Sequence, residues 1–165
     1  MKVNPKIDLV FKKLFGSEEN TDILMSLVNS ILPANEQISE LILLNPYNVS
    51  DYAQGKLSIL DIRAKDKNGV QYDIEMQIRG YEFYGRRTLY YWAKMYGTQL
   101  DYLQKEKNSE NNEDNQADET IENDYKLSKA TSYSELKKCI VISLVDFNFF
   151  KDERYQRYFT LKDAE

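Results

Sequence analysis

The chain has 165 residues, of which 42% are hydrophobic and 30% charged, enough for one compact domain with its own core. It contains no histidine and one cysteine, so a Ser-His-Asp or Cys-His hydrolase, an imidazole-ligated zinc site and an intramolecular disulfide are all excluded. The net charge of −5 argues at first sight against a nucleic-acid partner. Any enzymatic chemistry must rest on oxygen and amine groups, and oxygen ligands favour Mg²⁺ or Mn²⁺.

The N-terminal part of the chain predicts two helices and a strand. Apolar residues recur at helical spacing over residues 6–15, and again from about 18 to 32, where Ser17 is a candidate N-cap and Pro33 ends the helix. The apolar run 41–44 is short and favours a strand. No run is long enough to span a bilayer and the N-terminus does not resemble a signal peptide, so we expect a soluble, cytoplasmic protein without a membrane partner.

Two runs, 57–65 and 70–78, flank a turn sequence that ends in Gly69 and predict a β-hairpin. Leu60, Ile62 and Ala64 form the apolar set of the first run, and the apolar residues of the second run also fall on even positions. Both sets can face one core only if the numbers of opposite residues add to an even value. A three-residue loop, with Gly69 in the left-handed conformation, makes that value 136 and places Asp61 opposite Glu75.

The polar face of this hairpin is a candidate metal site. Directly opposite side chains stand about 5 Å apart at Cβ, so the Asp61 and Glu75 carboxylates would repel unless a cation lay between them. A divalent ion can polarise a phosphate and lower the pKa of an attacking water, and Gln77 is the next residue on this face. The alternative is the solvated face of an ordinary amphipathic hairpin, and we expect Asp73, on the same face, to be structural or solvent-exposed.

The second half predicts a helix, an insertion and a strand. The helix covers about 82–103, and its expected core stripe is Leu89, Trp92, Tyr96, Leu100 and Leu103. Residues 104–131 form an acidic, low-complexity insertion that we expect to be disordered, and they carry −4 of the total charge of −5. Residues 138–146 predict a strand buried on both faces, with Cys139 as a buried thiol.

These elements predict one α/β domain made of residues 1–103 and 132–165, with a mixed central sheet of about four strands flanked by helices. Because the acidic charge lies mainly in the insertion, it no longer argues against DNA as a partner. The tyrosines of the long helix, Tyr84, Tyr90, Tyr91 and Tyr96, could stack on bases. Packing against the sheet is the favoured interpretation for them.

Five ordered blocks carry a resemblance to a known family. They are residues 8–16 (DLVFKKLFG), 60–62 (LDI), 72–77 (YDIEMQ), 87–92 (RTLYYW) with 99–100 after it, and 133–150. Together they resemble the PD-(D/E)XK nuclease family transposases, also called recombination-promoting nucleases. The resemblance implies a restriction-endonuclease-like core in which Asp61 and Glu75 bind Mg²⁺, or Mn²⁺, and Gln77 takes a position that is usually Lys.

The same resemblance implies an endonuclease that hydrolyses DNA phosphodiesters with a metal-activated water. Asp8 and Arg87 fall in matching blocks, and with Lys12 they are candidate accessory residues or phosphate contacts. A homodimer is a further expectation, because nucleases of this kind often pair to cut both strands. The alternative is a catalytically inactive or truncated relic that acts as a DNA- or protein-binding module.

Overall fold

The structure is a computed structural model that describes residues 4–44, 47–48, 58–59, 61–111 and 133–161. Its helices are α1 (Asp8–Phe15), α2 (Thr21–Ile31) and α3 (Tyr84–Asn111), with short 3₁₀ turns η1 (Glu18–Asn20) and η2 (Ala34–Glu36). Its strands are β1 (Leu41–Leu44), β2 (Tyr47–Asn48), β3 (Ser58–Ile59), β4 (Ile62–Asp66), β5 (Gln71–Gln77) and β6 (Cys139–Val145).

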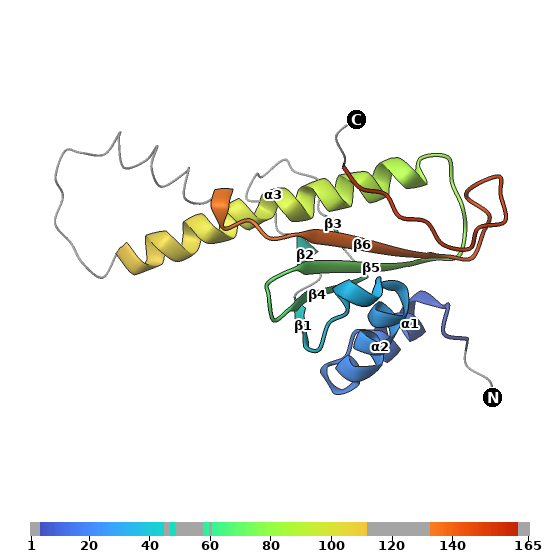
Figure 1. Cartoon of the computed structure of the whole chain (residues 1–165), viewed down its shortest axis with the longest axis horizontal. Helices are drawn as coiled ribbons and strands as arrows, with labels where there is room; N and C mark the ends of the chain where they lie inside the picture. The colour runs from blue at the N-terminus through green and yellow to red at the C-terminus, as the bar shows by residue number, and fades with distance from the viewer. Residues whose placement is uncertain (1–3, 45–46, 49–57, 60, 112–132, 162–165) are drawn as a thin grey trace.

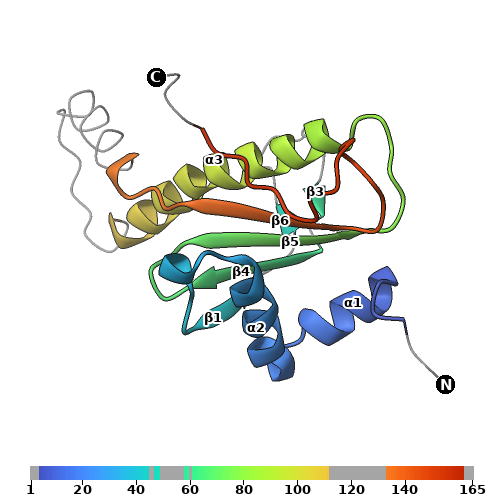
Figure 2. The same ribbon diagram turned by 45° about the vertical axis from the view of Figure 1, so that its right-hand side comes forward.

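A four-stranded mixed sheet forms the centre of the molecule, with the strand order β1-β4-β5-β6. Neighbouring strands are antiparallel from β1 to β5, whereas β5 and β6 are parallel and are connected through α3. Figures 1 and 2 show α1 and α2 on one side of this sheet and α3 on the other. The prediction of an α/β fold with a mixed sheet of about four strands is therefore confirmed.

The face of the sheet toward α1 and α2 carries the hydrophobic core. Even-numbered residues of β4 and β5 lie on this face, and Ala64 and Ile74 are wholly buried there against Leu24 and Val28 of α2. Phe11 is the buried residue of α1. The alternation of side chains along a strand explains why every even position faces the same layer.

The hairpin between β4 and β5 has the predicted register. Ile62 lies opposite Ile74 and Ala64 opposite Tyr72, so opposite residues add to 136. Gly69 has a φ of 82°, which is the left-handed conformation expected for the end of a three-residue loop. Asp66 closes this loop, because its carboxylate accepts the backbone N–H groups of Asn68 and Val70 at 2.8 and 2.9 Å.

Two predicted N-terminal features differ in the structure. The expected strand 57–65 is broken into β3, which pairs with β2 in a separate two-stranded sheet, and β4, which joins the main sheet. Asp61 occupies the break. Ser17 makes no side-chain cap, and a 3₁₀ turn precedes α2, so the α-helix begins at Thr21 instead of near residue 18.

Helix α3 is longer than predicted and presents a different face to the sheet. It continues to Asn111, eight residues beyond the predicted end and into the acidic segment. The rest of that segment, residues 112–131, lies outside the described residues.

The buried face of α3 differs from the predicted stripe. Leu89 is 62% exposed and Tyr96 37% exposed, so the predicted stripe is wrong at these positions, whereas Tyr84, Met95, Thr98 and Gln99 are buried. The hydrophobic pattern failed because the sheet face beneath α3 is partly polar, so that Thr98 and Gln99 are buried beside Met95.

Strand β6 is held to α3 by side-chain contacts with its backbone. The amide of Gln99 accepts the Lys137 N–H at 2.9 Å and donates to the Lys137 carbonyl at 3.0 Å, and Trp92 Nε1 donates to the Cys139 carbonyl at 3.0 Å. Cys139 is buried as predicted, and burial raises the pKa of its thiol to about 11. The prediction of burial on both faces is wrong for the far end, where Val145 is exposed at the edge of the described sheet.

No helix in the described ranges combines the length and the apolar character that a membrane span requires.

Candidate metal and phosphodiester site

The face of the sheet toward α3 carries the polar residues of the two central strands, β4 and β5. Odd-numbered residues of β4 and β5 project from it, and those of β5 are Gln71, Asp73, Glu75 and Gln77. The one-sided distribution follows from the same alternation that gathers the apolar residues on the opposite face. The polar side chains therefore lie between the sheet and a helix, where they need partners.

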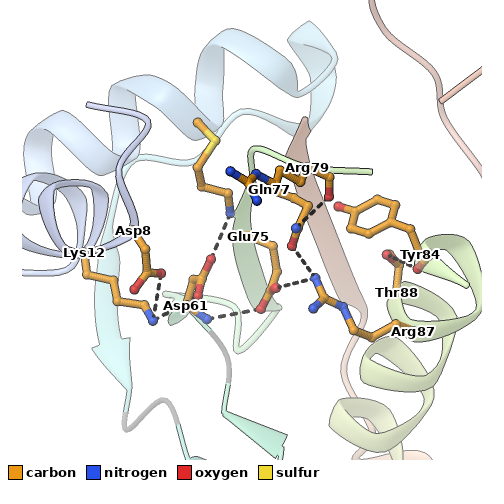
Figure 3. Close-up of polar contacts among 10 residues, drawn as sticks. Asp8, Lys12, Asp61, Glu75, Gln77, Arg79, Tyr84, Arg87 and Thr88 are labelled. Carbon is orange, nitrogen blue, oxygen red and sulfur yellow. Dashed lines mark hydrogen bonds and ion pairs between the residues drawn. The ribbon is translucent and has the colours of Figure 1, made fainter. Parts of the chain in front are cut away.

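Asp61 and Glu75 interact in a reciprocal way (Figure 3). The Asp61 backbone N–H donates to Glu75 Oε1 at 3.1 Å, and the Met76 backbone N–H donates to Asp61 Oδ2 at 3.0 Å. Each carboxylate thus continues the hydrogen bonding between the two chain segments at the break between β3 and β4. This arrangement keeps the two side chains adjacent and leaves the second oxygen of each, Asp61 Oδ1 and Glu75 Oε2, for other partners.

Lys12 and Asp8 approach Asp61 from α1. Lys12 Nζ lies 3.0 Å from Asp61 Oδ1 and 3.1 Å from Asp8 Oδ1, so one ammonium joins the helix to the sheet. Burial by itself would lower the pKa of Lys12, but hydrogen bonds to Asp61 and Asp8 raise it above its ordinary value. Lys12 is therefore a stable cation at this position.

Arg87 approaches Glu75 from α3. Its Nη2 lies 3.7 Å from Glu75 Oε2 and donates to Gln77 Oε1 at 2.9 Å. The guanidinium carbon also lies 5.0 Å from the ring centre of Tyr81 and 5.5 Å from those of Tyr84 and Tyr91. Stacking on aromatic faces is typical of arginine and restrains the orientation of its planar group.

Both ends of the Gln77 amide are engaged by the protein. Its oxygen accepts from Arg87, and its Nε2 donates to the backbone carbonyl of Arg79 at 2.8 Å (Figure 3). In this structure Gln77 therefore orients Arg87. The described contacts bring all six residues singled out by sequence into one connected group, with Asp8, Lys12 and Asp61 on one side and Glu75, Gln77 and Arg87 on the other.

Asp73 lies on this face, and the expectation that it could be solvent-exposed is wrong. It is wholly buried, and neither of its carboxylate oxygens has a hydrogen-bond partner among the described residues. Burial, together with the nearby charges of Glu75 and Asp61, raises its pKa to about 9. Strand alternation placed Asp73 on the same face as Glu75, but the sequence could not show that α3 would exclude water from it.

Glu75 shares part of this environment. Burial is the main cause that raises the pKa of Glu75 above its ordinary value, and the Asp61 charge acts in the same direction. The Asp61 backbone N–H and Arg87 oppose the shift. The Glu75 carboxylate is therefore held beside Asp61 at an electrostatic cost, which a bound cation would relieve.

The donor set fits a small, hard cation. Asp61 Oδ1 lies beside the Lys12 ammonium and Glu75 Oε2 lies beside the Arg87 guanidinium. Both oxygens therefore occupy positions that attract positive charge. Among the described residues, no three His, Cys, Asp or Glu side chains are placed to share one ion. Mg²⁺ commonly takes only one or two carboxylates and completes its shell with water and phosphate oxygens, so a pair of carboxylates is sufficient.

An α/β core with a four-stranded mixed sheet, flanked by helices and carrying an acidic pair on its central hairpin, is consistent with the restriction-endonuclease-like class. The family model of the PD-(D/E)XK nuclease family transposases matches residues 5–117, which is more than half of the chain. The chain therefore belongs to this family, and the resemblance seen in the sequence is confirmed. Neither a search of curated proteins nor a search of solved structures gave a significant match.

Proposed function

We propose that the chain is a Mg²⁺-dependent DNA endonuclease of the recombination-promoting type. The observation that carries this proposal is the reciprocal pairing of Asp61 and Glu75, which keeps two carboxylates adjacent at the edge of the site although burial raises the pKa of Glu75. Family membership supports the same activity. Mn²⁺ has the same preference for oxygen ligands and is expected to substitute.

In the proposed reaction, water attacks the phosphorus of a DNA phosphodiester and the bond to one bridging oxygen breaks, which leaves a phosphate and a hydroxyl end. Asp61 and Glu75 would hold the divalent ion, whose chemistry is to polarise the phosphate and to lower the pKa of the attacking water. Arg87 offers positive charge for a phosphate oxygen, and Gln77 keeps its guanidinium in place. Asp8 is an accessory residue through Lys12.

A plasmid assay tests this proposal. Supercoiled plasmid incubated with the protein and Mg²⁺ should be nicked or linearised, and EDTA should abolish the reaction. Asp61→Asn and Glu75→Gln should each lose about 100-fold or more of the rate, because each removes one charged ligand. Asp101→Asn, at an exposed position of α3, is the matched control and should cut at the parent rate. Cutting at the parent rate by Asp61→Asn and Glu75→Gln would contradict the proposed site.

A second candidate is a binding module without cleavage activity. It is favoured by the neutralisation of both carboxylates by Lys12 and Arg87, a state that is complete without an added ion. This candidate predicts that the protein shifts labelled duplex DNA in a gel while leaving plasmid intact at any Mg²⁺ concentration. A homodimer and a cytoplasmic location stay predictions.

A further inference from the structure

Lys12 differs from the other groups at the site in how it is held. Its ammonium extends from α1 to Asp61, and its side chain is 36% exposed, whereas the Asp61 side chain is 14% exposed. The ion pairs with Asp8 and Asp61 account for two of its three N–H donors. Lys12 is therefore accessible from solvent, as is Arg87, whose side chain is 32% exposed.

Among the described residues, Gln77 and Arg87 are held more firmly beside the acidic pair than Lys12 is. Gln77 is neutral, and both ends of its amide are engaged by Arg79 and Arg87. Arg87 is charged but is restrained by three aromatic rings and by Gln77. A lysine is a compact charge on a flexible stem, so Lys12 can move from one oxygen to another at low cost.

Lys12 also competes for the oxygen that a metal ion would use. Asp61 Oδ2 is engaged by the Met76 N–H, so Oδ1 is the oxygen left for a cation, and Lys12 lies 3.0 Å from it. A divalent ion and the ammonium cannot both be close to Oδ1 without repulsion. Asp8, four residues earlier on α1, offers Lys12 a second carboxylate when Asp61 is occupied.

We propose, on the basis of the proposed nuclease function, that Lys12 supplies the exchangeable positive charge of this site. In the resting protein it neutralises Asp61. When a divalent ion binds Asp61, the ammonium is released toward Asp8 and donates to a non-bridging oxygen of the DNA phosphate, where negative charge grows during attack. Lys12 therefore weakens metal binding and accelerates cleavage. A lysine that only stabilises α1 would not produce this pair of opposite effects.

The test measures metal affinity and cleavage on the same full-length variants. Mn²⁺ affinity, measured by isothermal titration calorimetry without DNA, should rise about 10-fold in Lys12→Met, equivalent to about 1.4 kcal/mol. Plasmid cleavage by the same variant at saturating metal should fall about 10-fold or more. Lys12→Arg keeps the charge and should stay near the parent affinity. Lys13→Met, at the exposed neighbouring position, should change neither quantity.

A charge-retaining variant separates lost charge from lost folding. Lys12→Arg, which keeps the charge at this position, should retain more of the cleavage rate than Lys12→Met. Thermal unfolding of each variant checks that the fold is retained.

Unchanged affinity and cleavage in Lys12→Met would overturn the inference, and so would a parallel fall of both. A parent protein that binds Mn²⁺ but cuts no DNA would overturn the proposed function instead. The role of Lys12 at Asp61 would then be decided by the affinity change alone. A parent protein that binds no Mn²⁺ would overturn both.

Discussion

The two faces of the central sheet use the same two strands for opposite purposes. Ala64 and Ile74 face α1 and α2 in an apolar core, whereas Asp73 and Glu75, one position away from Ile74, face α3 in a polar layer. The apolar face stabilises the fold by removing area from water. The polar face retains carboxylates whose pKa values are raised by burial, a cost that is characteristic of functional sites.

One register between β4 and β5 decides which residues lie on each face of the sheet. A shift of one residue between β4 and β5 would place Ile74 under α3 and Glu75 in the core. The register depends on a three-residue loop and on Gly69. Substitutions on the two faces should therefore differ in kind: those on the core face should change stability strongly, and those on the polar face should change stability, pH dependence and chemistry in separate ways.

The largest effect is expected on the core face. Ile74→Ala removes a wholly buried side chain and should lower the free energy of unfolding by about 2–5 kcal/mol, measured by urea denaturation. Lys65→Ala, at an exposed position of the neighbouring strand, is the control and should stay within about 0.5 kcal/mol of the parent. Similar losses for both variants would contradict the division of the sheet into two faces.

A gain in stability is expected from Asp73→Asn. The pKa of Asp73 is about 9 in the folded protein and about 4 in an unfolded chain, so between these pH values the folded state keeps a proton that the unfolded state releases. Stability of the parent should fall as pH rises through this window. With EDTA present, the variant should be about 1–3 kcal/mol more stable at pH 8 and less dependent on pH.

Thermal unfolding between pH 5 and pH 9 measures this difference, with Asp101→Asn as the exposed control. Equal pH dependence of the two proteins, with Asp73→Asn less stable than the parent, would show that the buried carboxyl is stabilised in its charged form.

A smaller loss is expected where α3 holds β6. Gln99→Leu removes both hydrogen bonds to the Lys137 backbone and should cost about 1–2 kcal/mol in urea denaturation. Hydrogen exchange at the Lys137 amide should accelerate in Gln99→Leu. Unchanged exchange at that amide would show that α3 does not secure this end of the strand.

The smallest effects on stability are expected at two glycines, with a loss at Gly69 and a gain at Gly97. Gly69→Ala places a side chain at a φ of 82° and within 3.2 Å of Lys137 Cγ, so it should cost about 1 kcal/mol. Gly97→Ala lies within α3, where a Cβ meets no atom within 4 Å, and should stabilise the protein by about 0.5–1 kcal/mol. A neutral result at Gly69 would indicate that the loop does not control the register.

The sequence predicted the β4–β5 hairpin correctly and the buried face of α3 incorrectly, for physical reasons. Parity of apolar positions was sufficient to derive the pairing of Ile62 with Ile74, because one buried face leaves one possible register. The stripe of α3 was mispredicted, because hydrophobic periodicity assumes an apolar surface beneath the helix. Here the helix also covers polar residues, and Gln99 can be buried because its amide hydrogen-bonds to the Lys137 backbone.

At the candidate site, too, local features were predictable from the sequence and contacts between elements were not. Alternation and the family pattern, which are local properties of one hairpin, were sufficient to predict that Asp61, Glu75 and Gln77 lie on one face. The bonding of Gln77 to Arg87 was not predicted, because Arg87 comes from another element and its position depends on how α3 packs. Asp73 was placed on the correct face, but its burial depends on the same packing.

The sequence by itself determined the chemistry available to this protein: no imidazole, one inert thiol, and an acidic pair on a hairpin whose register follows from alternation. Only the tertiary structure decided how that pair is neutralised, because Lys12 and Arg87 reach it from helices on opposite sides of the sheet. Side-chain alternation is a local rule that composition and spacing reveal. The approach of two charges from distant elements depends on packing, and it sets the electrostatics of the site.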